Sequence, residues 1–367
     1  MRAASHARIE GDARLAPFAC FSATAWESVA TERRTPMQHH IWARARAETL
    51  PPGQSVEVAV VGDVTAPAAL APLARSAGFP ARLRLLGAEE LGEPVEVAYR
   101  DQAAIEALAR VLAGLGLPIG FGHYFVETPL IAALRTAYHG SGLVVTRPLA
   151  QRGAPFIELN EGWCEPEGNF QPGRRSDFRR MQRNAEKMGK VRVDIITPDP
   201  RDVAQLLEEA LAVETRNWKG RARTAVALDS RLSRFYRRYA ELAAHAGILR
   251  LCFLRIGAAT AAMQIAVECE QRFWLLKIGY DEAFKRCAPG NLLLRETIRH
   301  AAERKLKHYE FLGKEAPWTE LWTAAARDLV ALRTYPFNAA GAAAAALDGI
   351  DLAVARLRKT ITRRADA

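Results

Sequence analysis

The sequence predicts an α+β protein made of two units, each a mixed, mostly antiparallel sheet flanked by helices. The chain has 367 residues, which is enough for two domains of ordinary size. Its first half mixes strand and helix patterns without a glycine-rich phosphate loop, which is typical of an α+β unit. Its second half contains three successive strand patterns joined by very short turns, as in an antiparallel sheet.

The composition is that of an ordinary folded protein. Hydrophobic residues make up 49% and charged residues 25%, so sizeable cores can form and global disorder is excluded. Lys and Arg number 51 against 41 Asp and Glu, and the net charge of +10 favours anionic partners only mildly. Five cysteines lie far apart without a CxxC pair, which suits a reducing compartment. No signal-peptide core or membrane-spanning stretch is found, so we expect a cytoplasmic protein.

In the first half, apolar residues at helical spacing predict a helix over 101–115, with Asp101 as its N-cap. A second helix is expected at 127–139, and the segment 67–77 is expected to be a short helix or a loop. Apolar patterns bounded by turn residues predict strands at 56–63, 81–87, 119–125, 143–147 and 155–159.

The second half opens with a basic helix, 176–188, whose cations form either a solvated face or a polyanion site. Further helices are predicted at 200–218, 228–246 and 291–305. Strands are predicted at 191–196, 248–256, 259–268, 272–279 and 308–312.

The domain boundary is expected within 161–175, which carries three Gly and two Pro. The resulting division is a disordered N-terminus at 1–16, a first domain at 17–170, a second at 171–337 and an Ala-rich, then basic, helical tail at 338–367.

The loop from Lys285 to Asn291 is the best candidate for an anion site. Gly290 permits a tight turn into the following helix, and the first N–H groups of that helix have no backbone partner. With Lys285 and Arg286 beside it, such a terminus attracts an anion, although a plain turn is the alternative.

Four sequence runs resemble a known family. They are similar to the GNAT-type acyltransferases associated with bacterial cellulose and polysaccharide biosynthesis, which are relatives of the Fem-type peptidoglycan aminoacyltransferases. The resemblance covers about 179–322 and is weaker over about 18–159. The runs are 218–221, 277–281, 289–294 and 311–315.

The resemblance implies two GNAT-like domains in tandem, with the active cleft in the second. It also implies that the loop binds the pyrophosphate of an acyl-coenzyme A through Lys285, Arg286, Ala288, Gly290, Asn291 and Leu292. The family's loop usually reads Arg or Gln, two residues, Gly, one residue, Gly, whereas this chain has Lys285 and Ala288 at the first two of these positions. A Tyr-Lys pair that is usual in the family is replaced here by Trp318-Thr319.

Acyl transfer to an amine requires a neutral nucleophile, and hence a base or a water path. Asp281, at a strand exit beside the loop, is the first candidate base, and Glu315 is the second; either could instead be a turn or capping carboxylate. Tyr280 could protonate the departing thiolate, because a phenol and a thiol have similar pKa values, or it could be a strand-end aromatic.

The acceptor groove is expected on the strand and loops around this cleft. Strand alternation places Lys277 on the face of Gly279 and Asp281, where it could bind an acceptor carboxylate or phosphate. The resemblance adds four further candidates for substrate binding, which are Trp218, Lys219, Lys314 and Trp318, although Trp218 and Trp318 could instead be packing residues of the core.

We therefore expect an enzyme that moves an acyl group from acyl-coenzyme A to an amine or hydroxyl of a small molecule or glycan precursor. An aminoacyl-tRNA-dependent transferase and a catalytically inactive polyanion-binding module remain alternatives. Nucleic acid is not the expected partner. His300 and His308 lack metal-ligand spacing, so no metal is expected.

Overall fold

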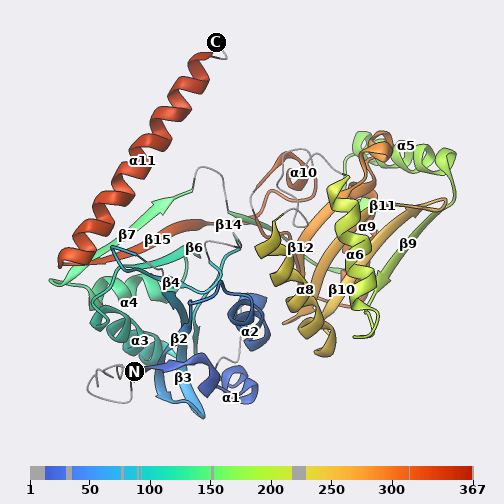
Figure 1. The fold of residues 1–367 in the computed structure, drawn as a ribbon. Helices are drawn as coiled ribbons and strands as arrows, with labels where there is room; N and C mark the ends of the chain where they lie inside the picture. Colours follow the sequence, from blue (N-terminus) through green and yellow to red (C-terminus); the bar gives the residue numbers. More distant parts are fainter. Residues whose placement is uncertain are drawn as a thin grey trace. The chain divides into compact units, whose positions relative to one another are not determined.

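A computed structural model of the chain describes residues 13–29, 35–75, 78–88, 91, 93–149, 153–216, 229–313 and 315–365, with side chains over 14–355. It divides into two compact units. Unit 1 comprises 1–43, 50–149 and 329–367, and unit 2 comprises 44–49 and 150–328. Figure 1 shows the elements of both units. Of the N-terminus 1–16 that was expected to be disordered, residues 1–12 lie outside the described residues, whereas 13–16 belong to a paired strand, β1 (Ala13–Pro17), because this segment adds to the edge of the sheet.

Unit 1 is built on a mixed sheet of eight strands with the order β1-β2-β3-β4-β6-β15-β7, to which β5 adds by pairing with β3. All of these pairings are antiparallel except that of β4 with β6. The strands are β1 (Ala13–Pro17), β2 (Val56–Asp63), β3 (Ala66–Arg75), β4 (Leu83–Leu85), β5 (Ala98–Tyr99), β6 (Ile119–Phe125), β7 (Gly142–Pro148) and β15 (Leu329–Pro336).

The helices of unit 1 follow from their apolar spacing and caps. The predicted cap is confirmed, because the Asp101 carboxylate accepts a hydrogen bond from the Ala104 amide at 2.8 Å. The helix that it starts, α3, packs against α4, β2 and β3. The helical elements are η1 (Phe18–Cys20), α1 (Ala23–Glu27), η2 (Pro36–Gln38), α3 (Gln102–Gly114), α4 (Pro129–Ala137) and α11 (Ala339–Ala365), and α2 (His40–Glu48) crosses the division between the units.

One local prediction in unit 1 is wrong. The segment 67–77, expected to be a short helix or a loop, contains most of β3, an inner strand of the sheet. β3 is buried on both faces over most of its length, so its sequence lacks the alternation that marks a half-exposed strand. Pro72 in this strand has no N–H to donate, but its carbonyl accepts a hydrogen bond from the Leu86 amide at 2.9 Å.

Unit 2 contains a seven-stranded sheet with the order β14-β8-β13-β12-β11-β10-β9. Its pairings are antiparallel except that of β12 with β13. These two mixed, mostly antiparallel sheets flanked by helices confirm the predicted fold class. The strands are β8 (Ala154–Glu158), β9 (Val191–Ile196), β10 (Leu249–Ile256), β11 (Ala259–Cys269), β12 (Arg272–Tyr280), β13 (His308–Glu310) and β14 (Ala326–Arg327).

Helices cover both faces of this second sheet. On one face, α5 and α9 enclose a core that includes Phe178, Leu293, Ile298 and Tyr309. α6 packs on β10, β11 and β12, and α8 packs on β10. The helical elements are η3 (Glu161–Cys164), η4 (Pro166–Asn169), α5 (Pro172–Met188), α6 (Val203–Thr215), α8 (Ser230–His245), η6 (Glu282–Cys287), α9 (Pro289–Glu303) and α10 (Pro317–Glu320).

The boundaries of unit 2 differ from those expected for the second domain, since its main segment runs from 150 to 328 and the expected domain ran from 171 to 337. β8, placed by the sequence in the first domain, pairs with β13 and β14 and so lies in unit 2. β15, placed by the sequence in the second domain, pairs with β6 and β7 and so lies in unit 1. The physical reason is long-range strand pairing, which leaves no signal in local composition.

Candidate active site

A pocket of about 460 Å³ opens at the carboxyl end of β12 in unit 2. Its walls come from three segments that are separate in the sequence: the end of β12, the turn from η6 into α9, and α10. The lining residues are Ile278, Gly279, Tyr280, Lys285, Ala288, Pro289, Gly290, Asn291, Leu294 and Trp318.

The pocket exists because two neighbouring strands part. β12 and β13 pair in parallel only over Arg272–Trp274 with His308–Glu310. Beyond this point β12 continues to Tyr280 along β11, but it has no further pairing with β13 among the described residues. The widening interval leaves the end of β12 open to a ligand, as at the carboxyl ends of parallel strands elsewhere.

The strand β12 contains a β-bulge that decides which side chains reach the pocket. The register against β11 shifts at Leu276, after which Ile278 and Tyr280 pack toward the core under α9. Lys277 points instead to the α8 face, where its ammonium nitrogen lies 5.1 Å from the centre of the Tyr236 ring. Lys277 is therefore not among the residues that line the pocket.

The tight turn into α9 is made by Ala288, and the expectation that Gly290 makes it is wrong. Ala288 has φ +44° and ψ +57°, the left-handed region that glycine adopts more easily. Gly290 already lies within the helix, after Pro289 at its first position. A Cβ on Gly290 would meet only Tyr280 Cδ1, at 3.9 Å, so glycine here keeps the pocket side of the helix clear.

The first turn of α9 offers one unpaired amide to the pocket. Pro289 has no N–H group, and the amides of Asn291 and Leu292 donate to the Ala288 carbonyl at 2.9 and 3.3 Å. The Gly290 amide has no acceptor among the described residues. The prediction of several open amides is thus corrected to one, which still lies at the positive end of the helix.

The predicted donor-binding residues separate into two groups. Lys285 and Asn291 line the pocket together with Ala288 and Gly290. Arg286 is exposed at the turn but does not line the pocket. Leu292 is fully buried in the core under α9, because its position faces the sheet.

The three predicted catalytic residues lie in different settings. Tyr280 is half-buried in the pocket wall. Asp281 is held on both oxygens: Oδ2 pairs with Arg216 Nε at 2.8 Å, and Oδ1 accepts from the Ala283 amide at 3.0 Å. Glu315 is half-buried near the start of α10, and no hydrogen bond or ion pair engages it within the described part of the chain.

Of the predicted substrate-binding residues that the structure describes, Lys277 and Trp318, only Trp318 lines the pocket. Its ring is 37% exposed and stands edge-on to Phe311 with ring centres 5.8 Å apart. Trp322, four residues later, lies beyond the end of α10 and is buried against Phe170 and Phe178. Three other calls, Trp218, Lys219 and Lys314, lie outside the described residues.

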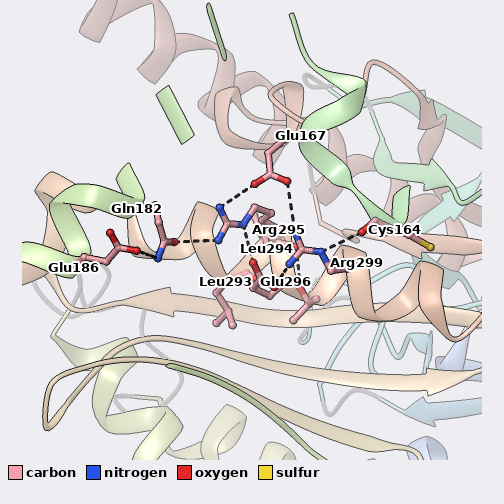
Figure 2. A network of polar contacts seen from close by, with 10 residues as sticks. Cys164, Glu167, Gln182, Glu186, Leu293, Leu294, Arg295, Glu296 and Arg299 are labelled. Atoms are coloured by element: carbon pink, nitrogen blue, oxygen red, sulfur yellow. Dashed lines mark hydrogen bonds and ion pairs between the residues drawn. The ribbon is translucent and has the colours of Figure 1, made fainter. Parts of the chain in front are cut away.

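A polar network holds α9, and with it the pocket turn, in place. Figure 2 shows Arg295 donating to Glu167 at 3.0 Å and to Gln182 at 3.1 Å, which ties α9 to η4 and α5. Arg299 donates to the Cys164 carbonyl at 3.1 Å and pairs with Glu167 at 3.6 Å. These charge-assisted bonds fix the helix that carries the Gly290 amide.

A buried carboxylate marks the last residue pair before the strands part. Glu310 is 1% exposed, and its carboxylate accepts a hydrogen bond from Arg327 at 2.9 Å and pairs with Arg272 at 3.4 Å. Burial raises the pKa of Glu310, and the two arginines oppose that rise. This cluster joins β14, β13 and β12 near the point where the pairing between β12 and β13 ends.

Sequence reasoning missed the apolar part of the pocket. Ile278, Pro289 and Leu294 are ordinary apolar residues that could equally belong to a core, and no local signal separates the two roles. Gly279 did carry a signal, since a Cβ there would lie 3.2 Å from the Glu214 backbone on α6. A glycine inside a strand pattern indicates such a close approach.

The described residues contain neither a metal-binding group nor a membrane-spanning helix. No group of three or more His, Cys, Asp or Glu side chains is arranged to hold a metal ion. No helix there combines the length and apolar character required to cross a bilayer.

Comparison with known proteins agrees with this geometry. Residues 172–320, within unit 2, match the family model described as an acetyltransferase (GNAT) domain. A search of curated protein sequences finds no match. Unit 2 thus has the fold of a GNAT-type acyltransferase.

Solved structures show the same fold over most of the chain. FemX aligns with a TM-score of 0.57 and 12% identity, covering 86% of this chain and 95% of that one. The C-terminal domain of a putative lysylphosphatidylglycerol synthetase from Agrobacterium fabrum aligns with a TM-score of 0.55 and 10% identity, covering 90% and 95%. A conserved protein of unknown function from Bacteroides thetaiotaomicron aligns with a TM-score of 0.52 and 11% identity, covering 85% and 95%. At these identities the similarity concerns the fold alone.

Proposed function

We propose that unit 2 transfers an acyl group from acyl-coenzyme A to an amine or hydroxyl acceptor. The observation that carries the proposal is the pocket of about 460 Å³, where an unpaired helix amide, a lysine and an apolar wall meet. This volume is within the usual range of about 300 to 1,000 Å³ for small-molecule sites. An amide at a helix N-terminus next to a cation suits a phosphate group.

The start of α9 and the end of β12 orient the donor within the pocket. We assign its pyrophosphate to the Gly290 amide and the Lys285 ammonium, with Asn291 as a further polar contact. The pantetheine arm and thioester then follow the end of β12 between Ile278 and Tyr280, with the apolar wall beside them. The opening between β12 and β13 admits the acceptor to the thioester carbonyl.

The reaction is a nucleophilic substitution at the thioester. The lone pair of the acceptor nitrogen or oxygen attacks the carbonyl carbon, the carbon–sulfur bond breaks, and the thiolate leaves. A base takes the proton of the acceptor, and we assign Tyr280, which lines the pocket, as the group that gives its phenolic proton to the thiolate.

Glu315 suits the role of base better than Asp281 does. Both oxygens of Asp281 already have partners, Arg216 on one and the Ala283 amide on the other, so the carboxylate is held in place by its own neighbours. Glu315 has no such partner among the described residues, and it precedes by three positions Trp318, which lines the pocket although Glu315 itself does not. We therefore propose Glu315 as the base and Asp281 as a positioning residue.

A second candidate, aminoacyl transfer from a charged tRNA, is favoured by one observation. The basic helix α5 exposes Arg179, Arg180 and Arg183, which could contact a nucleic-acid backbone. A catalytically inactive polyanion-binding module would use the same face. A glycan-precursor acceptor and a link to polysaccharide biosynthesis remain proposals that follow from the sequence resemblance.

A thermal-shift screen of the full chain tests the donor. Coenzyme A and acyl-coenzyme A at about 100 times their Kd should stabilise the protein by about 2.7 kcal/mol. The same screen with uncharged tRNA should give no shift at physiological salt. A tRNA-dependent shift without one from coenzyme A would contradict the proposal and favour the second candidate.

A further inference from the structure

The last helix of unit 1, α11, has an apolar face that no described residue covers. Leu347, Ile350 and Val354 are 45, 58 and 43% exposed. They are three and four residues apart, which places them on one side of the helix. Figure 1 shows α11 extending away from the sheet of unit 1, so most of its length lies beyond the strands that hold it.

The opposite side of α11 is anchored to the sheet. The Asp348 carboxylate accepts hydrogen bonds from Arg82 at 2.6 Å and Tyr335 at 2.6 Å, and it pairs with Arg333 at 2.6 Å. Ala344 is fully buried on this side. The exposed apolar stripe is therefore directed outward by a firmly held helix base, and it is not a consequence of a loosely attached tail.

The sequence extends this stripe and adds charge to it. Leu357 and Ile361 continue the spacing of three and four residues, and α11 runs to Ala365. Between Val354 and Ala365 there is no acidic residue. The same stretch contains five cations, which are Arg356, Arg358, Lys359, Arg363 and Arg364.

We propose that α11 docks unit 1 onto an anionic lipid bilayer, lying in the plane of its surface. An apolar stripe with a dense set of cations on the same helix is the composition of an interfacial helix, in which the stripe enters the headgroup boundary and the cations meet lipid phosphates. A membrane-spanning role is not involved, because the helix carries too many charges.

Charge and length favour a lipid surface over a second copy of the chain. The stripe from Leu347 to Ile361 covers about two heptads, and a coiled coil needs about three or four. Five like charges in its last part would repel a parallel copy of the same helix. An anionic surface is complementary to the same charges, and one cation near it typically adds about 1 kcal/mol to binding.

Vesicle co-sedimentation of the full chain tests the proposal. Vesicles with about 30% phosphatidylglycerol in phosphatidylcholine should bind the protein at least tenfold more tightly than phosphatidylcholine alone. Raising the NaCl concentration from about 0.05 to 0.5 M should weaken that binding, because the shorter Debye length screens the cations.

Two variants separate the stripe from the charge. Replacing Leu347, Ile350 and Val354 by Ser should lower binding about tenfold or more, with the fold intact because all three are exposed. Replacing Arg356, Arg358 and Lys359 by Gln should remove the preference for phosphatidylglycerol. The matched control, Val126→Ser with Met188→Ser, removes similarly exposed apolar side chains elsewhere and should bind as the unmodified protein does.

Three outcomes would overturn the proposal. They are absence of binding to the anionic vesicles, unchanged binding by the triple Ser variant, and a stable dimer in light scattering that the triple Ser variant abolishes while vesicle binding is absent. Since the acyl-transfer pocket is in unit 2, acyltransferase assays in solution should not change in either α11 variant.

Discussion

Unit 1 and unit 2 each contain a helix that links two strands paired in parallel, and the two helices begin differently. In unit 1, α3 lies between β4 and β6 in the sequence, and in unit 2, α9 lies between β12 and β13. The N-terminus of α3 is capped by the Asp101 carboxylate. That of α9 has no side-chain cap and leaves the Gly290 amide unpaired.

The space beside the paired strands also differs, because it is closed in unit 1 and open in unit 2. In unit 1, a Cβ on Gly122 of β6 would lie 2.7 Å from the Ala88 carbonyl oxygen, so backbone packs directly on the strand. The same arrangement of two parallel strands and a helix can thus have its helix N-terminus capped by a carboxylate of the chain, or left uncapped so that an external anion can bind there.

The largest expected effect belongs to the proposed base. Glu315→Gln should lower kcat by about 10² to 10⁴ while leaving the Kd for coenzyme A nearly unchanged, because the amide keeps the shape and cannot take a proton. Steady-state kinetics and calorimetry measure the two quantities. The matched change in unit 1, Glu106→Gln on the exposed side of α3, should affect neither.

Asp281→Asn sharpens this assignment. If Asp281 only positions Arg216 and η6, its kcat should fall less than that of the Glu315 variant, and the thermal midpoint should fall as well. A larger loss of kcat in the Asp281 variant than in the Glu315 variant, with unchanged stability, would exchange the two roles.

A carboxylate at the start of α9 should make unit 2 resemble unit 1. Asp tolerates the left-handed conformation of residue 288, and Ala288→Asp can accept a hydrogen bond from a first-turn amide and repel the donor phosphate. Coenzyme A affinity should fall about 30- to 100-fold, the equivalent of one lost charge-assisted bond and added repulsion. Ala288→Gly, which fits the same backbone without adding a cap, should bind as the unmodified protein does.

Acid should weaken unit 2 through Glu268. Burial alone would raise the pKa of Glu268, but the His300 imidazole, 3.7 Å away, and ion pairs with Arg304 and Arg250 lower it to about 2 from an ordinary 4.5. A depressed carboxyl pKa stabilises the fold above 4.5, and that stabilisation is lost as pH falls toward 2. Urea unfolding of the unmodified protein should therefore show a falling free energy over this window.

Glu268→Gln should flatten that part of the pH profile and lower stability at pH 7. In unit 1, Asp348 provides the comparison, since its pKa is also lowered: burial opposes the shift, and Tyr335, Arg82 and Arg333 outweigh it. An unchanged acid profile in the Glu268 variant would mean that the cluster around Glu268 does not control acid stability.

The smallest expected effect is the loss of the cap in unit 1. Asp101→Ala should cost about 1 kcal/mol of stability, the usual contribution of an N-cap side chain. Because Asp101 is not among the residues that line the pocket of unit 2, coenzyme A binding should not change. Weaker donor binding in this variant would mean that unit 1 takes part in the donor site.

The sequence was sufficient for elements whose signals are local. The α3 helix and its Asp101 cap, and the strands β2, β6 and β9, lie where spacing and turn residues predict them. The pocket turn was found from Gly290 and its cations, but the left-handed residue is Ala288, whose side chain gives no hint of that conformation.

What the sequence could not supply depends on distant pairing. The opening between β12 and β13 depends on where their pairing ends, and the bulge at Leu276 depends on β11. The same is true of Asp281, whose partner Arg216 lies on another segment. Local sequence patterns carry no information on contacts between distant segments, so the opening, the bulge and the Asp281 ion pair could not be predicted from them.

The position of β15 within the sheet of unit 1 has a consequence for synthesis. Residues 150–328 of unit 2 leave the ribosome as one stretch, whereas the sheet of unit 1 needs β15, residues 329–336, between β6 and β7. During translation, β6 and β7 must wait with unpaired edges until the whole of unit 2 has been made. The half of the chain that is synthesised first is thus completed last, which reverses the usual N-terminal-first order and leaves strand edges of unit 1 unpaired in the meantime.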